Sequence, residues 1–442
     1  MARAGSAISG SRNEALHKHL DQLGWSIRGF ARRVYERCRV VGLTNTVSPS
    51  TAARWCSNET TPSAPLAAAA CHVLSVARRQ QVTPESLGWP ADTEDIPTES
   101  LEYSDLAHAL RMLPRLWEID SLRDRSFVKN TFFPDDGVFG AASREALVMP
   151  PDAQVAGCGS YKVTIADIQL LEDQTKLYGT LDAQHGGGKF RGVFAGFLAM
   201  HTTPLLSGSF SAKLGRRLYG SVADAVLAMA SMAYDDHLPG FAQRYDLQAM
   251  RLAQAIGDRA RIARVHIHQA RLAAAQGDRK DVLTHARGAV LACDGAPPLV
   301  QAYAAITEAR AWAFNGSAEQ TLDAVARARD KFDRAKGASQ LAWLSWFDRY
   351  ELEAQAAWAL AVAGLVEPGE KALKEADGMP RERTRDRVEL LITGAELARL
   401  RGNCTEYEEQ ARRAAEAARH LVSRRLAARI ARLTAGQPLD GF

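Results

Sequence analysis

The chain has 442 residues, about three domains on the usual length prior, and its 46% hydrophobic content is that of an ordinary globular protein. No stretch approaches about 20 uninterrupted apolar residues and no apolar segment follows the first residues, so we expect no membrane span, no secretory leader and a cytoplasmic location. The six cysteines form no Cys-x-x-Cys pair. This favours reduced buried thiols over a zinc site or a disulfide frame, and we expect neither metal nor cofactor.

The net charge of +4 is unevenly distributed. Residues 1–90 hold eleven Lys and Arg against five Asp and Glu, whereas the rest of the chain holds 44 against 46. Basic charge concentrated in one N-terminal region is typical of proteins that bind a phosphate backbone.

The apolar spacing predicts a first helix over residues 12–23, ended by Gly24. Ser26 is expected to cap a second helix whose inward side carries Ile27, Phe30, Ala31 and Val34. The outward side carries five arginines suited to DNA backbone contact: Arg28, Arg32, Arg33, Arg37 and Arg39.

The segment 48–56 predicts a short helix with two different sides. Ser48 is a good N-cap, and Pro49 suits the first helical position. On a 3.6-residue period Ala52 and Trp55 face the core. The polar side brings four residues to the major groove as expected base contacts: Pro49, Ser50, Thr51 and Arg54. The alternative is an amphipathic surface helix that happens to carry an arginine.

The connection before this helix, residues 40–47, is longer than the usual turn of a helix-turn-helix. Either the second helix extends by a turn, or the connection bulges toward DNA. The bulge would add Thr44, Asn45 and Thr46 to Ser48 as contacts to the DNA backbone. Asn58 is expected to end the short helix in the left-handed conformation, before a helix over about 63–80 and a closing segment at 82–89.

Residues 12–89 resemble the Xre/Cro-type helix-turn-helix of actinobacterial regulators. The resemblance rests on Phe30-Ala31, the Ser-x-Ser-Thr that begins at Ser48, Arg54-Trp55, and the closing Val82-Thr-Pro-x-x-Leu-Gly-Trp. In Streptomyces-type regulators, among them the NsdA-like regulators of development and antibiotic production, such a domain precedes a tetratricopeptide-like (TPR) region. The resemblance implies base contacts at Pro49, Ser50 and Arg54, with Thr51 beside them. The long connection and Asn58, where Gly is common, depart from the family pattern.

Residues 90–102 are acidic, contain two prolines and predict a linker. Residues 103–216 predict a helical connecting region, in which Thr164 and Asp167 form a capping box that opens a helix through Leu181. The triplet Gly186-Gly-Gly188 predicts a tight turn between helices rather than an anion cradle, because no strand precedes it.

Residues 217–442 contain a repeat. Each repeat has Ala seven residues before Gly, with the glycines at 277, 316, 364 and 402. The glycines lie 39, 48 and 38 residues apart, which predicts a TPR-like solenoid of helix pairs. An earlier pair is expected over 218–257, and a helix over 421–433 is expected to cap the array.

The concave face of such an array is expected to bind a peptide, a small molecule or a protein. The candidate lining residues are His268, Arg271, Tyr303, Glu308, Arg310, Trp343, Trp346, Asp348, Arg349 and Glu353. The alternative is that these tryptophans belong to the core and the charges to a solvated face. The seven arginines between 412 and 432 predict a basic surface cap, although contact with DNA or with the acidic linker is an alternative.

Catalytic patterns are absent from the sequence. Asp235-Asp236-His237 and His266-x-His268 contain suitable residue types, but the two histidines fall on different helix faces and no third ligand is identifiable. We expect no enzyme. We expect an all-α transcriptional regulator that associates with the nucleoid when it is bound to DNA. Its homodimer is expected to read a palindromic operator, while residues 217–442 sense a signal and set the geometry of the dimer. The alternative is a TPR adapter that binds protein without specific DNA binding.

Overall fold

A computed structural model describes residues 12–40, 47–78, 80, 82–89, 101–121, 135–335 and 341–438. The chain is all-α, as predicted. The described residues form only two short strands, β1 (Gly157–Cys158) and β2 (Ser209–Phe210), which pair antiparallel with Gly157 opposite Phe210. The described residues divide into two compact units: 12–89, 135–140 and 238–240 form the first, and the remainder forms the second.

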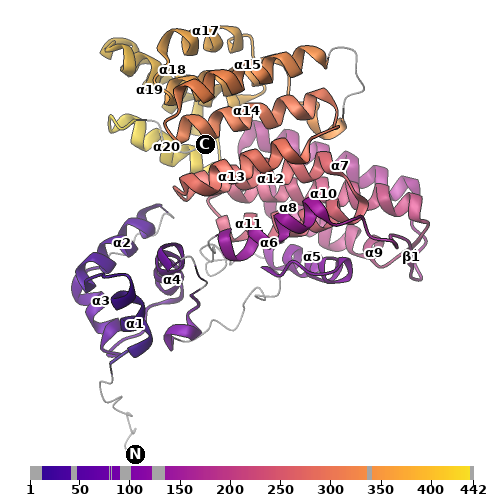
Figure 1. Cartoon of the computed structure of the whole chain (residues 1–442), viewed down its shortest axis with the longest axis horizontal. Coiled ribbons are helices and arrows are strands. Elements are labelled where there is room, and N and C mark those ends of the chain that lie inside the picture. The colour runs from indigo at the N-terminus through magenta and orange to yellow at the C-terminus, as the bar shows by residue number, and fades with distance from the viewer. Residues whose placement is uncertain are drawn as a thin grey trace, which may run out of the picture. The chain divides into compact units, whose positions relative to one another are not determined.

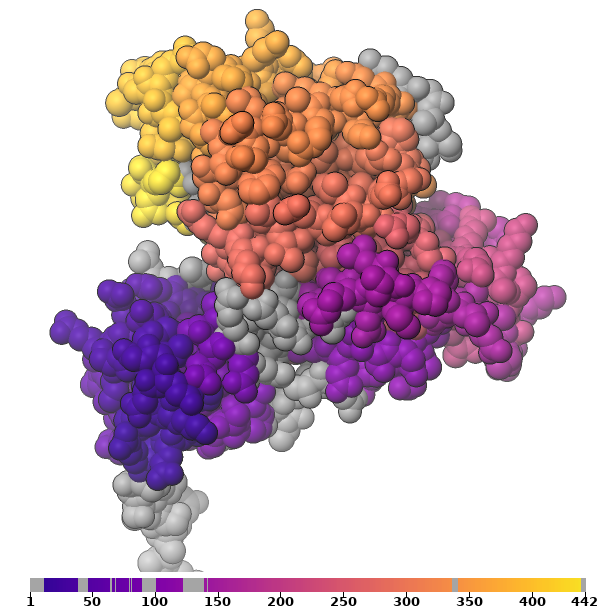
Figure 2. All heavy atoms as spheres, in the orientation of Figure 1, coloured from indigo at the N-terminus to yellow at the C-terminus, as the bar shows by residue number. Residues whose placement is uncertain are grey.

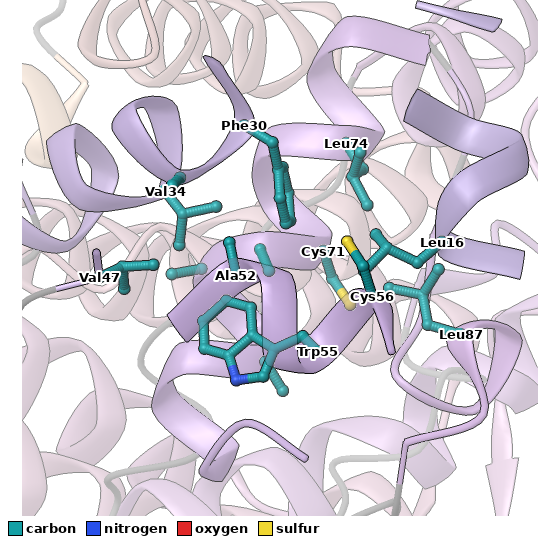
Figure 3. Packing of buried hydrophobic residues seen from close by; sticks show 14 of the residues in the cluster. Leu16, Phe30, Val34, Val47, Ala52, Trp55, Cys56, Cys71, Leu74 and Leu87 are labelled. Carbon is teal, nitrogen blue, oxygen red and sulfur yellow. The ribbon is translucent and has the colours of Figure 1, made fainter. Parts of the chain in front are cut away.

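The first unit holds four helices and a 3-10 turn: α1 (Glu14–Gln22), α2 (Ile27–Val40), α3 (Pro49–Cys56), α4 (Ala64–Arg78) and η1 (Glu85–Leu87). Their apolar sides meet in one core, with Phe30, Val34, Ala52, Trp55 and Leu74 pointing toward one another (Figure 3). Gly24 ends α1 at a φ of +62°, and Asn58 follows α3 at a φ of 53°. The predicted core sides of α2 and α3 are therefore confirmed.

A buried asparagine, which the sequence analysis did not single out, joins three elements of this unit. The Asn13 side chain accepts from the Leu16 N–H at 3.0 Å and so caps α1. Its amide donates to the Leu87 carbonyl of η1 at 2.9 Å, and its backbone N–H donates to the Cys56 carbonyl at the end of α3 at 2.8 Å. Asn13 thus fixes where α3 ends relative to α1.

The second unit begins with helices that precede the repeats. They are α5 (Leu106–Ser121), α6 (Asp135–Val148, of which residues 141–148 belong to this unit), α7 (Ile165–His185), α8 (Gly187–Phe197), the π-helical turn η4 (Leu198–Thr202) and α9 (Thr203–Leu206). The predicted capping box is present: the Thr164 hydroxyl accepts from the Asp167 N–H at 3.3 Å, and the Asp167 carboxylate accepts from the Thr164 N–H at 2.7 Å. The helix continues past Leu181 to His185.

The repeats form helix pairs that succeed one another along the array (Figure 1). The helices are α10 (Ala212–Asp235), α11 (Pro239–Ile256), α12 (Arg259–Ala275), α13 (Arg279–Ala292), α14 (Pro298–Phe314), α15 (Ala318–Arg334), η5 (Ala342–Leu344), α16 (Arg349–Val362), α17 (Val366–Ala376), α18 (Thr384–Arg401), α19 (Cys404–Ala417), η6 (Ala418–His420) and α20 (Arg424–Thr434). Gly277, Gly316, Gly364 and Gly402 take φ values between +76° and +81°, which lets each pair turn. The predicted solenoid of helix pairs is confirmed, and its successive pairs present one continuous surface in Figure 2.

The array closes on itself. Helix α20 packs against α18 through Leu426 and Leu433, which lie in one apolar cluster with Val388 and Ile392, and α20 also contacts α10. Because α10, α12, α14, α16 and α18 each contact the next and α20 contacts α10, we call these six helices the ring. Helix α20 therefore connects the last helix pair of the array to its first helix, in addition to capping the array.

The glycine triplet is a tight turn, as predicted, and it is part of this closure. The Gly188 N–H donates to the Val422 carbonyl at 3.2 Å, and the Val422 N–H donates to the His185 carbonyl at 2.7 Å. A Cβ at Gly186, whose φ is +86°, would lie 2.6 Å from the Val422 oxygen. Glycine is needed here because two backbones approach closely.

Two further expectations concern the whole chain. No helix in the described part of the chain is long and apolar enough to cross a membrane. Cys38, Cys56, Cys71 and Cys293 are buried, but Cys158 and Cys404 are exposed, so the expectation of six buried thiols was wrong for these two. Cys158 lies in the short strand β1 and Cys404 in the first turn of α19, and both side chains face away from the interior.

Candidate nucleic-acid interface

Helix α3 has a buried side and an exposed side, as predicted. Ala52 and Trp55 are buried, and Trp55 meets Trp89 edge to face with ring centroids 6.0 Å apart. Pro49, Ser50 and Arg54 are exposed. The apolar side anchors the helix, and the polar side is left open to a partner.

Three hydroxyls at the start of α3 form a small network. The Ser48 hydroxyl accepts from the Thr51 N–H at 3.1 Å and thereby caps the helix. It also lies 2.8 Å from the Ser50 hydroxyl and 2.9 Å from that of Thr51, which is half-buried. Backbone N–H groups and small hydroxyls at a helix N-terminus suit a phosphate or a base edge.

Arg54 stands one turn further along α3. It is exposed and makes no ion pair with any described residue, so both edges of its guanidinium are open. A guanidinium in this position can donate two parallel hydrogen bonds to a guanine edge.

The neighbouring helix α2 adds exposed cations. Arg28 is exposed, and Arg32 is exposed in a 3.6 Å ion pair with Glu36. Arg33 is half-buried: its guanidinium carbon lies 4.2 Å from the centroid of the Trp25 ring and one of its N–H groups donates to the Gly29 carbonyl at 3.1 Å. An exposed surface pair contributes little to stability, so Arg32 can exchange Glu36 for a phosphate at small cost.

Arg37 does not belong to the exposed side of α2, and that expectation was wrong. Its side chain is buried, and burial lowers its pKa to about 10. Position 37 lies three residues after Val34 and next to Cys38, so the helical period turns it toward the core. The Arg39 side chain and residues Thr44, Asn45 and Thr46 lie outside the described residues.

The predicted groove residues of the array do not gather on one open face. Four of them are buried. Tyr303 packs edge to face against Trp346, and His268 bonds the Asp246 carboxylate at 3.0 Å. The Glu353 carboxylate is bound by Arg329, and the Glu308 carboxylate accepts from Arg327 at 2.7 Å. As exposed lining groups these four were wrong. The helix pairs pack so closely through alanine that positions on their contact sides lose access to solvent.

The other groove candidates have assigned partners or remain near the surface. Trp346 is 39% exposed, Trp343 lies under the Arg264 guanidinium at 4.9 Å, and Asp348 caps α16. Arg349 lies between Asp333 and Glu353. Trp343 and Trp346 therefore serve largely to pack neighbouring elements together, as the alternative interpretation expected.

The C-terminal arginines are not all surface residues. Arg425 and Arg429 have side chains only 11% and 9% exposed, and both bind Glu389 of α18. Arg425 also reaches Asp235 of α10 at 3.3 Å. The expected basic surface cap was wrong for these two because ring closure turns one side of α20 inward.

The acidic and histidine residues singled out in the sequence have structural partners in the described part of the chain. No group of three or more His, Cys, Asp or Glu side chains is placed to hold a metal ion among those residues. Asp235 accepts from the Gly187 N–H at 3.0 Å and from the Ser423 hydroxyl at 2.8 Å, and therefore serves ring closure. The two histidines have separate partners, since His266 faces His285 with their Nδ1 atoms 3.4 Å apart.

A comparison with known protein families matches the N-terminal part of the chain. Residues 16–90 match a family model described as the SP15 N-terminal domain, and the matched segment runs from α1 through η1. No curated protein and no solved structure matches the chain significantly.

Proposed function

We propose that the first unit binds double-stranded DNA with α3 in the major groove, and that the protein is a cytoplasmic transcriptional regulator. The observation that carries this proposal is the exposed side of α3, where an N-capped helix start and Arg54 lie on a helix anchored by Ala52 and Trp55. Arg28 and Arg32 of α2 would hold the backbone. The +6 charge of residues 1–90 supplies the attraction.

Substitution of a residue that contacts bases should affect DNA binding differently from substitution of a residue that contacts the DNA backbone. Arg54→Ala should cost about 1–3 kcal/mol on the specific site and relax the preference at one base pair. Arg32→Ala should weaken specific and random DNA alike and reduce the salt dependence. Arg413→Ala, an exposed arginine of α19, is the matched control and should change neither.

The test is DNA affinity at several salt concentrations, measured for these three variants on selected and random duplexes. An equal loss on both duplexes for Arg54→Ala would remove the base-reading role. We further propose that the protein acts as a homodimer on a palindromic site, since one short helix covers few base pairs.

A protein-binding adapter is the second candidate, and exposed apolar side chains favour it. Leu170 and Leu177 of α7 and Val193 of α8 are each about half exposed or more, as is Met200 in η4. Large exposed apolar side chains on neighbouring elements are typical of protein interfaces. Salt-insensitive binding to a protein, without DNA binding, would favour this candidate.

A further inference from the structure

Helix α7 has an exposed apolar side. Leu170 and Leu177 are 47% and 48% exposed, whereas Ile168 and Leu171 of the same helix are buried. Residues seven apart lie on one side of a helix. The two exposed leucines therefore form an apolar strip along α7 that faces away from the core of the second unit.

Helix α8 extends this strip sideways. Tyr178 of α7 stacks on Phe194 of α8 with ring centroids 4.6 Å apart, and Phe197 continues the stack at 6.4 Å from Phe194. Val193 and Met200 are 60% and 72% exposed, and the helical period places both beside Phe197. We call the four exposed apolar residues the α7/α8 face: Leu170, Leu177, Val193 and Met200.

The α7 part of this face is symmetric in its spacing. Six residues on one side of α7 are spaced identically in both directions along the helix: Ala166, Leu170, Asp173, Gln174, Leu177 and Leu181. Apolar residues lie at both ends of this set, and polar residues lie at its centre. A two-fold axis between Asp173 and Gln174 therefore places Leu170 opposite Leu177 of the partner subunit, with the two α7 helices antiparallel. A face that matches itself in this way favours a second copy of the chain over an unrelated protein.

The polar centre of the set also fits a second copy. The Asp173 carboxylate accepts from the Gln169 amide at 3.1 Å through one oxygen, and its other oxygen has no donor in the described part of the chain. The two-fold axis places Gln174 of the partner subunit opposite Asp173, where its amide can donate. Lys176 is exposed, and Lys176 of the partner subunit lies within one helical turn of the same carboxylate. The centre of the face is therefore complementary to itself in charge.

The α7/α8 face is large enough for a weak dimer. From Ala166 to Leu181 the helical rise makes it about 23 Å long, and two neighbouring helices are about 20 Å wide. Each copy would bury on the order of 500 Å², and the pair about 1,000 Å². This area is at the lower limit for a specific interface, so we expect a Kd in the micromolar range.

We propose that two copies of this protein associate through the α7/α8 face, with the two α7 helices antiparallel and each Leu170 packed against Leu177 of the partner subunit. The interface would lie before the repeats, in the helices that precede the ring. It would supply the two-fold axis that a palindromic DNA site requires. This use rests on the proposed function, whereas self-association does not.

Sedimentation velocity of the full-length protein without DNA, from about 0.1 to 100 µM, measures the association. We expect a reversible equilibrium between monomer and dimer that changes little with salt, because the face is mainly apolar. Leu170→Lys and Leu177→Glu should each weaken association at least about tenfold, since each places an unpaired charge against a leucine. Leu322→Lys, at an exposed leucine of α15, is the matched control and should leave association unchanged.

A mixture of the two variants tests the antiparallel arrangement itself. In a mixed dimer the lysine introduced at position 170 faces the glutamate introduced at position 177, and the two remaining leucines face each other. The mixture should therefore associate at least about tenfold more tightly than either variant alone. The Tm of each variant at low concentration should equal that of wild type, because both leucines are already half exposed in one copy.

Three results would overturn the proposal. They are a chain that stays monomeric at every concentration, a dimer that both substitutions leave intact, and variants that do not regain association when they are mixed. None of these measurements uses DNA, so a failure of the proposed DNA function remains distinguishable.

Discussion

The two units of the chain bury charge differently. In the first unit the core is made of apolar side chains such as Phe30, Trp55 and Leu74, and Arg37 is the buried arginine among the residues described there. In the array, Glu353, Arg425 and Arg429 lie inside the helical layers and form ion pairs. The first unit is held by packing and leaves its other described arginines exposed or half-buried. In the array, charged side chains form ion pairs that hold neighbouring helices together.

This difference matters for function. Cations outside a packed core are open to a partner of opposite charge, as Arg28 and Arg54 are. Cations inside the array are bound by acids of neighbouring helices, as Arg425 and Arg429 are by Glu389. The same residue type thus lies open on the surface of one unit and joins helices in the other.

The largest effect on stability is expected at Trp55. Trp55→Ala removes a buried ring and its edge-to-face contact with Trp89, and should destabilise the first unit by about 3–5 kcal/mol. Hydrogen exchange should show loss of protection in α1 to α4, with α12 to α15 unchanged. Uniform loss of protection along the whole chain would contradict a separately packed core.

In the array the corresponding change is Glu389→Gln. It leaves Arg425 and Arg429 without their shared carboxylate and should cost about 3 kcal/mol. Denaturant unfolding at neutral pH measures this cost. Glu396→Gln, which removes the local pair with Arg399 within α18, is the control and should cost less.

The same carboxylate predicts a pH dependence. Burial alone would raise the pKa of Glu389, but Arg429 and Arg425 outweigh burial and lower it to about 2 from its ordinary 4.5. Its contribution to stability is therefore complete above pH 4.5 and is lost as the pH falls toward 2. The Gln variant should lose less stability than wild type over this window, and parallel curves would contradict the assignment.

Ring closure is tested by two glycines with opposite surroundings. A Cβ at Gly186 would lie 2.6 Å from the Val422 carbonyl oxygen, so Gly186→Ala should destabilise closure by about 2 kcal/mol. Gly179 lies within α7 with nothing within 4 Å of an added Cβ, so Gly179→Ala should stabilise by about 0.5–1 kcal/mol. Hydrogen exchange of the α20 amides measures the effect of each variant on closure. Equal effects of the two variants would argue against closure at this turn.

The smallest effect separates fold from function at the start of α3. Ser48→Ala removes the cap and should cost about 1 kcal/mol. Ser48→Asp keeps a capping oxygen and should preserve stability, yet its negative charge should weaken binding to every DNA sequence alike. Thermal unfolding and DNA affinity together check the pair, and retained DNA affinity for Ser48→Asp would place α3 away from the phosphates.

The sequence predicted the parts of the fold that are local. Ser48 and Thr164 cap their helices through neighbouring N–H groups, and Gly277 and Gly402 turn helix pairs through their own backbone conformation. These features need only a few adjacent residues, so their patterns could be read directly.

Features that depend on distant contacts could not be predicted in this way. Arg425 and Glu353 looked like surface charges because the sequence does not show that α20 returns to α10 or that Arg329 meets α16. The ion pairs of Glu389 with Arg425 and Arg429 likewise exist only once the ring closes. Which charged side chains are buried was thus the property that the sequence predicted least well.

The central claim is that α3 reads DNA, and selection from a random pool of duplexes tests it most directly. The full-length protein is presented with the pool at about physiological salt, in parallel with a variant carrying Arg28→Ala, Arg32→Ala and Arg54→Ala. We predict enrichment of a two-fold symmetric site by the wild-type protein and loss of that enrichment in the triple variant. Failure to enrich any sequence, or the same enriched site with both proteins, would contradict the claim.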